Sequence, residues 1–397
     1  MSSLSYVLSP GVRHTVAVVV TGCLFLYAST QFQCIAAEPA GSIPFLDLND
    51  QAWRQVVVDR EAGQYIGHPT TLLLEDGKTI LCVYPKGHGR GAIVYKRSND
   101  GGLTWSDRLP TPVSWATSKE VPTLHRVIDA DGRKRVIMFS GLYPTRMAVS
   151  EDDGLSWSEL NPVGNWGGIV VMGCLIDLKT GPGHYMAMFH DDGRFFTDDG
   201  KLKKPVEFRL FSTKSKDGGL TWSYPDVVHQ ASSHHLCEPG IIRSPDGKQL
   251  AVLLRENSRR HNSQIIFTED EGNTWTDYRA MPASLNGDRH TGKYLPDGRL
   301  FISFRSNPPG GSGTIKHSGD WVAWVGTWDD LVGGKEGQYM VRLKDNKKGA
   351  DCAYPGVEVL PDGTIVTTTY GHWSQGQPPY VMSVRLRLSE LDELAVQ

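Results

Sequence analysis

The sequence of 397 residues carries no large excess of charge of one sign. Its formal net charge is −3 at pH 7 and it contains no basic stripe, so nucleic acid is not an expected partner. No long stretch shows the 3.6-residue period of an amphipathic helix, and helices should therefore be scarce. With 43 glycines, 23 prolines and 11 tryptophans, the composition is instead rich in turns and aromatic packing.

Cysteine is scarce as well, and no two cysteines form a Cys-x-x-Cys pair. Binding of a metal ion through thiolates is therefore not expected. Of the six cysteines, four lie outside the N-terminal segment, each in or beside an apolar run: Cys82, Cys174, Cys237 and Cys352. We expect these four to be buried thiols or to form one or two disulfides.

The first 37 residues differ in character from the rest of the chain. Arg13 precedes the apolar run Thr15–Tyr27, which is followed by polar residues and a pair of alanines. An apolar run of roughly 13 residues is short for a membrane span, and this order is typical of a secretory signal peptide. We therefore expect residues 1–37 to be a signal peptide and the protein to be exported, periplasmic, extracellular or on the cell surface. The alternative is an uncleaved anchor.

One eight-residue pattern, Ser/Thr-x-Asp-x-Gly-x-Thr/Ser-Trp, occurs four times, and successive copies start 52, 65 and 53 residues apart: 98–105, 150–157, 215–222 and 268–275. In such a turn the Asp side chain can accept hydrogen bonds from backbone N–H groups, and the Gly can adopt a positive φ. The Trp can pack between repeats, so we assign the four tryptophans to structure. A period near 50 residues favours a propeller blade over a helical solenoid.

A second turn signal, Asp-Gly between hydrophobic runs, marks hairpins at 72–83, 241–254, 294–304 and 357–367. Together the two signals predict an all-β, six-bladed propeller of four-stranded antiparallel blades, forming one domain over residues 43–390. The expected blades are 66–110, 118–160, 167–228, 235–280, 288–345 and 351–390. The fifth blade lacks the Trp-bearing turn. We expect residues 43–58 to complete the sixth blade and so close the ring.

The repeats resemble the Asp boxes of sialidases (neuraminidases), and the resemblance extends over residues 65–390. It implies a secreted exo-glycosidase that removes a terminal acidic sugar, of the sialic acid type, from a glycan and needs no metal or organic cofactor. The carboxylate of such a sugar needs cations, best supplied by guanidinium groups that pair with it bidentately. That carboxylate would repel a carboxylate nucleophile, and sialidases use a Tyr instead. A neighbouring base must activate the phenol, whose ordinary pKa is about 10.

The resemblance assigns roles to five residues of this chain. Glu238, at the start of the fourth blade, looks like the activating base, and Tyr354, which opens the sixth blade, looks like the nucleophile. Arg255 and Arg305 end equivalent strands of the fourth and fifth blades and resemble two of the three arginines that bind the sugar carboxylate. Arg90, in the loop after the second strand of the first blade, resembles a further arginine of the family.

The sequence departs from the family pattern in the first blade. His68 stands roughly where the first arginine of the trio would fall, and the loop 87–91 lacks the Asp that serves as proton donor. His68 and His88 should both face the central channel, and His titrates near neutral pH. We therefore consider both for substrate binding or proton donation, against the alternative of hydrogen-bonded loop residues.

Further candidates lie in loops of the second and third blades: Glu120, His190, Asp191 and Asp192. The last three are compatible with an acid, with metal ligands or with a polar turn. Two other functions stay open on the same fold. One is a polysaccharide lyase that acts on uronic-acid glycans with His and Tyr as base and acid. The other is a glycan- or protein-binding propeller without turnover.

Overall fold

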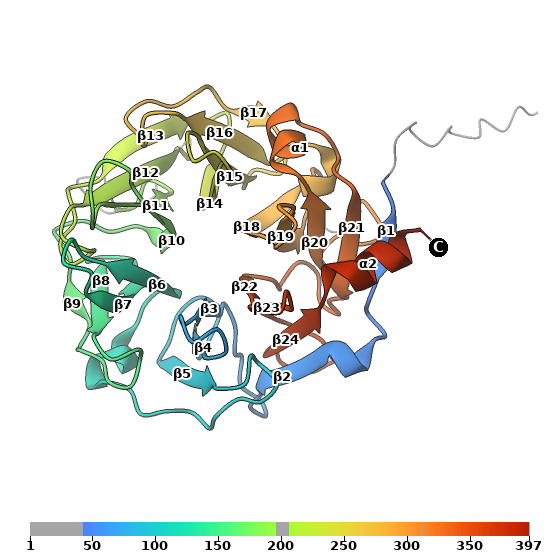
Figure 1. Cartoon of the computed structure of the whole chain (residues 1–397), viewed down its shortest axis with the longest axis horizontal. Coiled ribbons are helices and arrows are strands. Elements are labelled where there is room, and N and C mark those ends of the chain that lie inside the picture. The colour runs from blue at the N-terminus through green and yellow to red at the C-terminus, as the bar shows by residue number, and fades with distance from the viewer. Residues whose placement is uncertain (1–42, 196–205, 312, 397) are drawn as a thin grey trace, which may run out of the picture. The chain divides into compact units, whose positions relative to one another are not determined.

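The computed structural model describes residues 43–195, 206–311 and 313–396, and its compact unit Ile43–Gln397 is a six-bladed propeller (Figure 1). The expected signal peptide lies outside the described residues. The first three blades contain β3 (Thr70–Leu73), β4 (Ile80–Pro85) and β5 (Ile93–Ser98); β6 (Pro122–Ile128), β7 (Lys134–Ser140), β8 (Arg146–Ser150) and β9 (Asn161–Pro162); and β10 (Ile169–Asp177), β11 (Tyr185–Asp191), β12 (Phe208–Ser215) and β13 (Asp226–Ala231).

The other three blades contain β14 (Leu236–Arg243), β15 (Leu250–Glu256), β16 (Gln264–Thr268) and β17 (Arg279–Ala280); β18 (Gly287–Tyr294), β19 (Leu300–Ser306), β20 (Trp321–Gly326), β21 (Tyr339–Lys344) and β1 (Phe45–Asp47); and β22 (Gly356–Val359), β23 (Ile365–Gly371), β24 (Tyr380–Leu386) and β2 (Gln55–Asp59). Helices are short: α1 (Trp328–Gly333), α2 (Leu388–Ala395) and the 3-10 turns Ala52–Arg54, Val113–Thr117 and Ala283–Leu285. The prediction of an all-β, six-bladed propeller is confirmed.

Two blades differ from the four-stranded prediction. The first blade has three strands; the chain after β5 pairs with it only through isolated bonds such as Leu109 N–H to Tyr95 O, 2.9 Å. Pro110 and Pro112 follow and have no N–H to donate to a fourth strand. The fifth blade gains β1, which pairs in parallel with β21. Residues 43–58 were expected to complete the sixth blade, and this is only partly right. β2 closes the ring by pairing with β24 as the outer strand of that blade, but β1 of the same segment joins the fifth blade.

The hydrophobic core lies between neighbouring blades. In β7, Val136 and Met138 pack into a cluster shared with the first blade, whereas Ile137 and Phe139 pack into one shared with the third. Successive side chains of a strand point to opposite faces, so a strand between two blades must be apolar at every position. This explains continuous apolar runs such as that of β15, where Leu250 through Leu254 are all buried.

The four Trp-bearing repeats are turns that follow the third strand of the first four blades. In the copy at 215–222, one oxygen of Asp217 accepts the N–H of Thr221 at 3.0 Å, and the other accepts its hydroxyl at 2.6 Å. The N–H of Gly219, with φ of 81°, donates to Ser215 Oγ at 3.0 Å. Trp222 is buried between the second and third blades. The turn geometry predicted from the sequence is therefore confirmed.

The four cysteines within the described ranges, Cys82, Cys174, Cys237 and Cys352, are buried and free. Across residues 43–195, 206–311 and 313–396, the structure contains no helix long and apolar enough to cross a membrane.

Replacement of Asp217 by Ala should lower the free energy of unfolding by about 1 kcal/mol, because the turn loses an acceptor for a backbone N–H and a hydroxyl. Chemical denaturation at pH 7 measures the change. These bonds lower the pKa of Asp217 even though burial raises it, so this stabilisation is lost as the pH falls through that depressed pKa. Asp226→Ala, at an exposed position in β13, is the control; an equal loss in both variants would contradict the role of the turn.

Candidate active site

Each of five inner strands has a non-glycine residue in the left-handed region within three residues of its first residue, a conformation that disfavours residues other than Gly. These residues, with φ between 50° and 59°, are His68, Val170, Glu238, Arg289 and Ala353. The pairing of β10, β14 and β18 with their neighbours shifts register at the same level, as expected of bulges. The backbone distortion therefore recurs around one end of the central channel, where it redirects side chains.

A pocket of about 480 Å³ lies at this end of the channel. Its wall contains five of the seven residues predicted for the site: His68, His88, Arg90, Glu238 and Tyr354. The two remaining residues, Arg255 and Arg305, lie directly behind Glu238 and Tyr354. Residues that are up to 286 positions apart in sequence thus share one pocket.

The central pair of the pocket is Tyr354 and Glu238. The phenol of Tyr354 donates a hydrogen bond to Glu238 Oε1, and both side chains are buried. Burial and the charge of Glu238 raise the pKa of Tyr354 well above its ordinary value. Burial also tends to raise the pKa of Glu238, but Arg255, whose Nη1 lies 2.6 Å from Oε1, helps to lower it overall. The resting pair is therefore a neutral phenol beside a carboxylate, arranged for proton transfer.

Behind this pair, three arginines converge on the buried carboxylate of Asp288. Arg305 Nη2 and Arg259 Nη1 each lie 2.6 Å from it, and Arg255 Nε lies 3.3 Å away. Arg305 also donates from Nη1 to Cys352 O at 3.0 Å. Arg255 and Arg305 are thus held by protein acceptors, and the positive charge of the cluster is partly neutralised.

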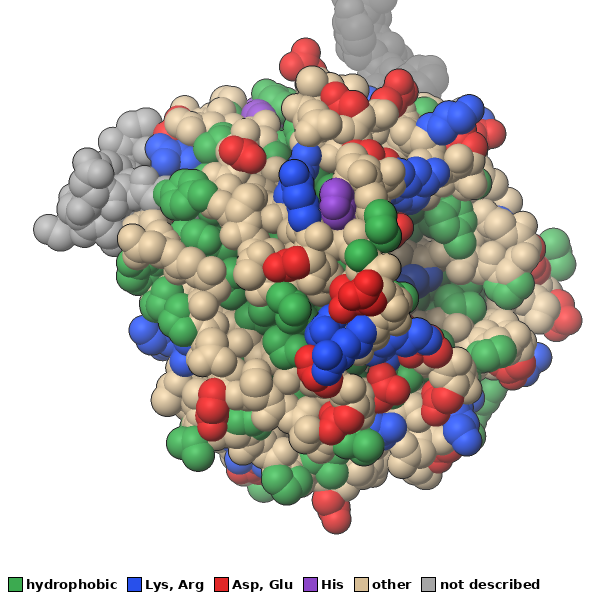
Figure 2. Space-filling view, turned by 60° about the vertical axis from the view of Figure 1, so that its left-hand side comes forward, with side chains coloured by type: hydrophobic (Ala, Val, Ile, Leu, Met, Phe, Trp, Pro, Cys, Tyr) green, Lys and Arg blue, Asp and Glu red, His purple; other side chains and the backbone are tan. Residues whose placement is uncertain are grey.

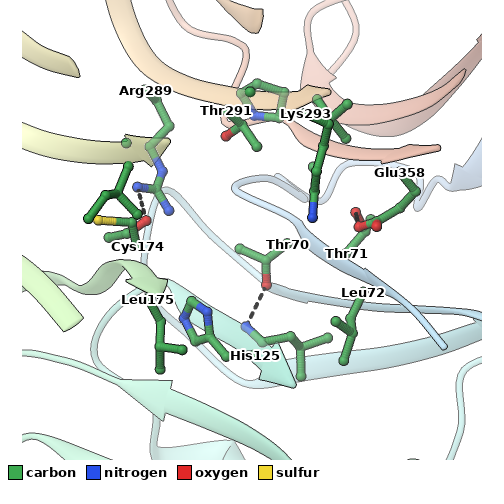
Figure 3. Close-up of a pocket in the computed structure, with 18 of the residues that line it drawn as sticks. Thr70, Thr71, Leu72, His125, Cys174, Leu175, Arg289, Thr291, Lys293 and Glu358 are labelled. Carbon is green, nitrogen blue, oxygen red and sulfur yellow. Dashed lines mark hydrogen bonds between the residues drawn. The ribbon is translucent and has the colours of Figure 1, made fainter. Parts of the chain in front are cut away.

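Arg289 follows Asp288 in β18, and its side chain is buried. Its Nη1 donates to Gly173 O at 2.6 Å, and its guanidinium lies 5.8 Å from the centre of the Tyr354 ring, as does that of Arg305. Figure 3 shows that Arg289 lines a second pocket, of about 310 Å³, together with His125, Lys293 and Glu358. The phenol ring therefore has two guanidinium groups near it.

His68 is buried and uses both ring nitrogens. Gly89 N–H donates to Nδ1 at 3.2 Å, so the ring proton is on Nε2, which lies 3.0 Å from the hydroxyl of Tyr370. Burial lowers the pKa of His68 well below its ordinary value. Its ring packs against that of Tyr354 with centroids 4.5 Å apart. His68 is therefore a buried, neutral residue packed against the phenol ring, at a position where the resemblance would place a cation.

Asp351 gathers the polar groups of the first and sixth blades. Tyr65 donates to its Oδ1 at 2.7 Å, and His372 Nε2 lies 3.0 Å from Oδ2. The exposed His88 has its Nδ1 2.8 Å from the Tyr65 hydroxyl and 3.4 Å from Asp351 Oδ1. Although burial raises the pKa of Asp351, the bonds from His88, Tyr65 and His372 lower it overall. His88 is thus held at Nδ1 in the wall of the pocket.

The other candidates take different places. Asp191 accepts the backbone N–H groups of Gly193 and Phe195, and Asp192 pairs with Arg194 at 2.7 Å, so both belong to a polar turn. His190 is buried, and its Nδ1 faces the N–H of Glu238 at 3.4 Å.

Arg90 is exposed at the mouth of the pocket. Glu120 is buried in its wall. On the face drawn in Figure 2, basic and acidic side chains are interspersed. Within the described ranges, no group of three or more His, Cys, Asp or Glu residues is arranged to hold a metal ion.

Sequence reasoning missed several residues of the site: Tyr65, Arg259, Asp288, Arg289, Asp351 and Tyr370. A usable signal existed for Asp288 and Arg289, because they open the fifth blade at the repeat position that Glu238 and Tyr354 occupy in the fourth and sixth. The other residues come from loops and strand ends, and only the fold shows their partners.

Residues 140–310 match the model of the BNR repeat-like domain. A structure from Dyadobacter fermentans, described as a protein of unknown function, is similar with a TM-score of 0.64 and 16% identity, over 84% of this chain and 98% of that one. An intramolecular trans-sialidase from Ruminococcus gnavus is similar with a TM-score of 0.55 and 14% identity, over 82% of this chain and 95% of that one. The chain is a six-bladed propeller with a BNR repeat-like segment, and its fold is similar to that of sialidases.

The NanB sialidase of Streptococcus pneumoniae is similar in fold as well, with a TM-score of 0.56 and 13% identity over 85% of this chain and 71% of that one. No curated protein matches the sequence. At these identities the likeness concerns the fold, and the residues of the pocket must support any functional conclusion.

Replacement of Asp288 by Asn should lower the free energy of unfolding by about 3 kcal/mol or more, because it leaves one buried and two largely buried guanidinium groups without their shared carboxylate. Thermal or chemical unfolding measures the loss. Asp192→Asn removes the partner of a more exposed arginine and should cost much less. An Asp288→Asn protein as stable as the unmodified one would show that the cluster does not depend on this charge.

Proposed function

We propose that the protein is a retaining exo-glycosidase that hydrolyses a terminal acidic sugar, of the sialic acid type, with Tyr354 as nucleophile and Glu238 as its base. The observation that carries the proposal is the hydrogen bond from the buried Tyr354 phenol to Glu238, in the wall of an open pocket. A base within hydrogen-bond reach, itself fixed by a third group, is the arrangement expected of an activated nucleophile. Arg255 is that third group.

These two residues account for the proton of the nucleophile in both steps. The leaving oxygen takes up a proton in the first step and the attacking water gives one up in the second, through a separate acid–base group. In the first step the Tyr354 oxygen bonds to the anomeric carbon, the bond to the leaving oxygen breaks, and the phenol proton moves to Glu238. In the second step water attacks the same carbon, the phenol leaves, and Glu238 returns its proton to Tyr354. Two displacements at one carbon retain its configuration. The guanidinium groups of Arg289 and Arg305, both near the ring, favour the phenolate that develops.

The charges around the pocket favour an anionic sugar. Four guanidinium groups, those of Arg255, Arg259, Arg289 and Arg305, face only two carboxylates, those of Glu238 and Asp288. At the mouth of the pocket, Arg90 and Lys119 are exposed cations. An anionic substrate is attracted by both sets, and a phenol nucleophile avoids the repulsion that a carboxylate nucleophile would meet.

Purified protein should release the acidic sugar from fluorogenic sialosides in a panel of glycosides, and Tyr354→Phe should lower kcat by about 10³-fold or more because it removes the nucleophilic oxygen. Steady-state fluorescence measures both. Tyr84→Phe is the matched control, since Tyr84 is also a buried phenol that donates to a carboxylate, Asp59, but lies outside the pocket. No turnover by the unmodified protein, with glycan binding retained, would contradict the hydrolase and favour the binding propeller.

One observation favours a second candidate, a polysaccharide lyase acting on uronic-acid glycans. His88 lies in the pocket wall with Tyr65 and Asp351 at its Nδ1, an arrangement that prepares the other ring nitrogen to act as a base. In that reaction the base removes the proton beside the sugar carboxylate, and a tyrosine protonates the departing oxygen as the C–O bond breaks and a C=C bond forms.

A lyase product is unsaturated and absorbs ultraviolet light, whereas a hydrolase product does not. Incubation with uronic-acid polysaccharides should therefore give no rise in ultraviolet absorbance if the hydrolase is correct, and sialosides should release free sugar. Absorbance that grows with time and disappears in His88→Gln would establish the lyase instead. A matched digestion with a known uronate lyase shows that the assay detects the product.

A further inference from the structure

We propose that Glu120 is a further catalytic residue of this pocket, the proton donor to the leaving-group oxygen. The inference rests on the function proposed above. Glu120 lies two residues before the start of β6 in the second blade. It lines the pocket together with Tyr354 and Glu238. Cleavage of a bond to an alkyl oxygen needs such a donor, because an alkoxide is a poor leaving group.

The other acidic residues near the pocket are already engaged. Glu238 is ion-paired with Arg255 and receives the proton of Tyr354. Asp288 is held by three arginines and is fully buried behind the pair. Asp351 accepts bonds from tyrosine and histidine side chains that lower its pKa overall. None of these three carboxylates is suited to carry a proton to a sugar oxygen.

Glu120 has the opposite environment. It is 8% exposed, and among the described residues no Lys, Arg or His lies within ion-pair distance of it. Its Oε1 accepts the N–H of Val121 at 2.8 Å. Two glycines leave room for the side chain: a Cβ at Gly141 would come within 2.9 Å of Glu120 Cγ, and one at Gly89 would lie 3.7 Å from Oε1. The carboxyl group therefore sits beside the loop 87–91, in which no carboxylate occurs.

The protonation of Glu120 agrees with this role. Burial raises its pKa to about 7, and the charge of Glu238 acts in the same direction, against the backbone N–H groups of Val121 and Val170 and the charge of Arg194. A carboxyl group poised near neutral pH can donate a proton and later accept one. Its proton moves to the glycosidic oxygen as that bond breaks. The carboxylate then removes a proton from the water that attacks the anomeric carbon.

The test compares Glu120→Gln with the unmodified protein on two glycosides of the same acidic sugar. One glycoside has an aryl leaving group that departs without a proton, and the other has an alkyl leaving group. Glu120→Gln should lower kcat/KM for the alkyl glycoside by about 10²-fold or more, while kcat/KM for the aryl glycoside stays within about tenfold. Glu358→Gln, at a buried glutamate of β22 outside the pocket, should behave as the unmodified protein on both.

A pH profile gives a second measurement. The donor must be protonated, so kcat/KM of the unmodified protein for the alkyl glycoside should fall as the pH rises through about 7. For the aryl glycoside, kcat/KM should not show this fall. His88, Arg90, Lys119 and Arg194 also face the pocket, and Glu120→Asp, which keeps a titratable group, should retain the fall at reduced activity.

The outcomes separate this inference from the proposed function. Equal losses on both glycosides, or no loss on either, would overturn the role of Glu120 while the hydrolase stands. The role of Glu120 would also be overturned if His88→Gln, rather than Glu120→Gln, lost activity on the alkyl glycoside alone. An unmodified protein that hydrolyses neither glycoside would overturn both proposals. Thermal unfolding of each variant confirms that it is folded.

Discussion

A single buried carboxylate, Asp288, holds the arrangement of the pocket. It belongs to the fifth blade and pairs with Arg255 and Arg259 of the fourth blade as well as with Arg305 of its own. Arg255 in turn contacts Glu238, to which Tyr354 of the sixth blade donates its hydrogen bond. A buried carboxylate surrounded by guanidinium groups is stable only while all partners are present. The positions of the proposed nucleophile and its proposed base therefore depend on how three blades meet.

The fold was predictable because each blade is specified locally. The turn at 215–222 is closed by bonds between residues at most four positions apart, so the sequence pattern contains its own structural cause. Apolar runs such as Leu250–Leu254 report burial on both faces of a strand. The additional strand β1 and the three-stranded first blade were not predicted. Strand β1 depends on pairing with β21, almost 300 residues away. The three-stranded blade results from the absence of regular pairing after β5.

The site was only partly accessible to sequence reasoning. Tyr354 and Glu238 stand at the same point of two repeats, and the structure brings them into contact. The sequence shows that Arg255 and Arg305 are present but not that Asp288 already occupies them, because partners from different blades have no fixed spacing. Nor does residue type reveal a backbone in the left-handed region, such as that of Glu238 and Arg289. Long-range contacts and backbone conformation are the information that the pattern lacks.

The neutral His68 changes how an acidic sugar would be recognised. A guanidinium at that position would be a buried cation next to the nucleophile, whereas His68 is buried without charge between Tyr354 and Tyr370. The buried arginines then serve mainly to fix Glu238 and to favour the phenolate, since Asp288 already occupies them. Under the proposed function, direct contacts to the substrate carboxylate come from cations at the mouth of the pocket, of which Arg90 is exposed, and the net positive charge of the buried cluster adds a longer-range attraction. Exposed charges are screened by salt and bind less rigidly than buried ones, so the proposed function separates activation of the nucleophile from capture of the anion.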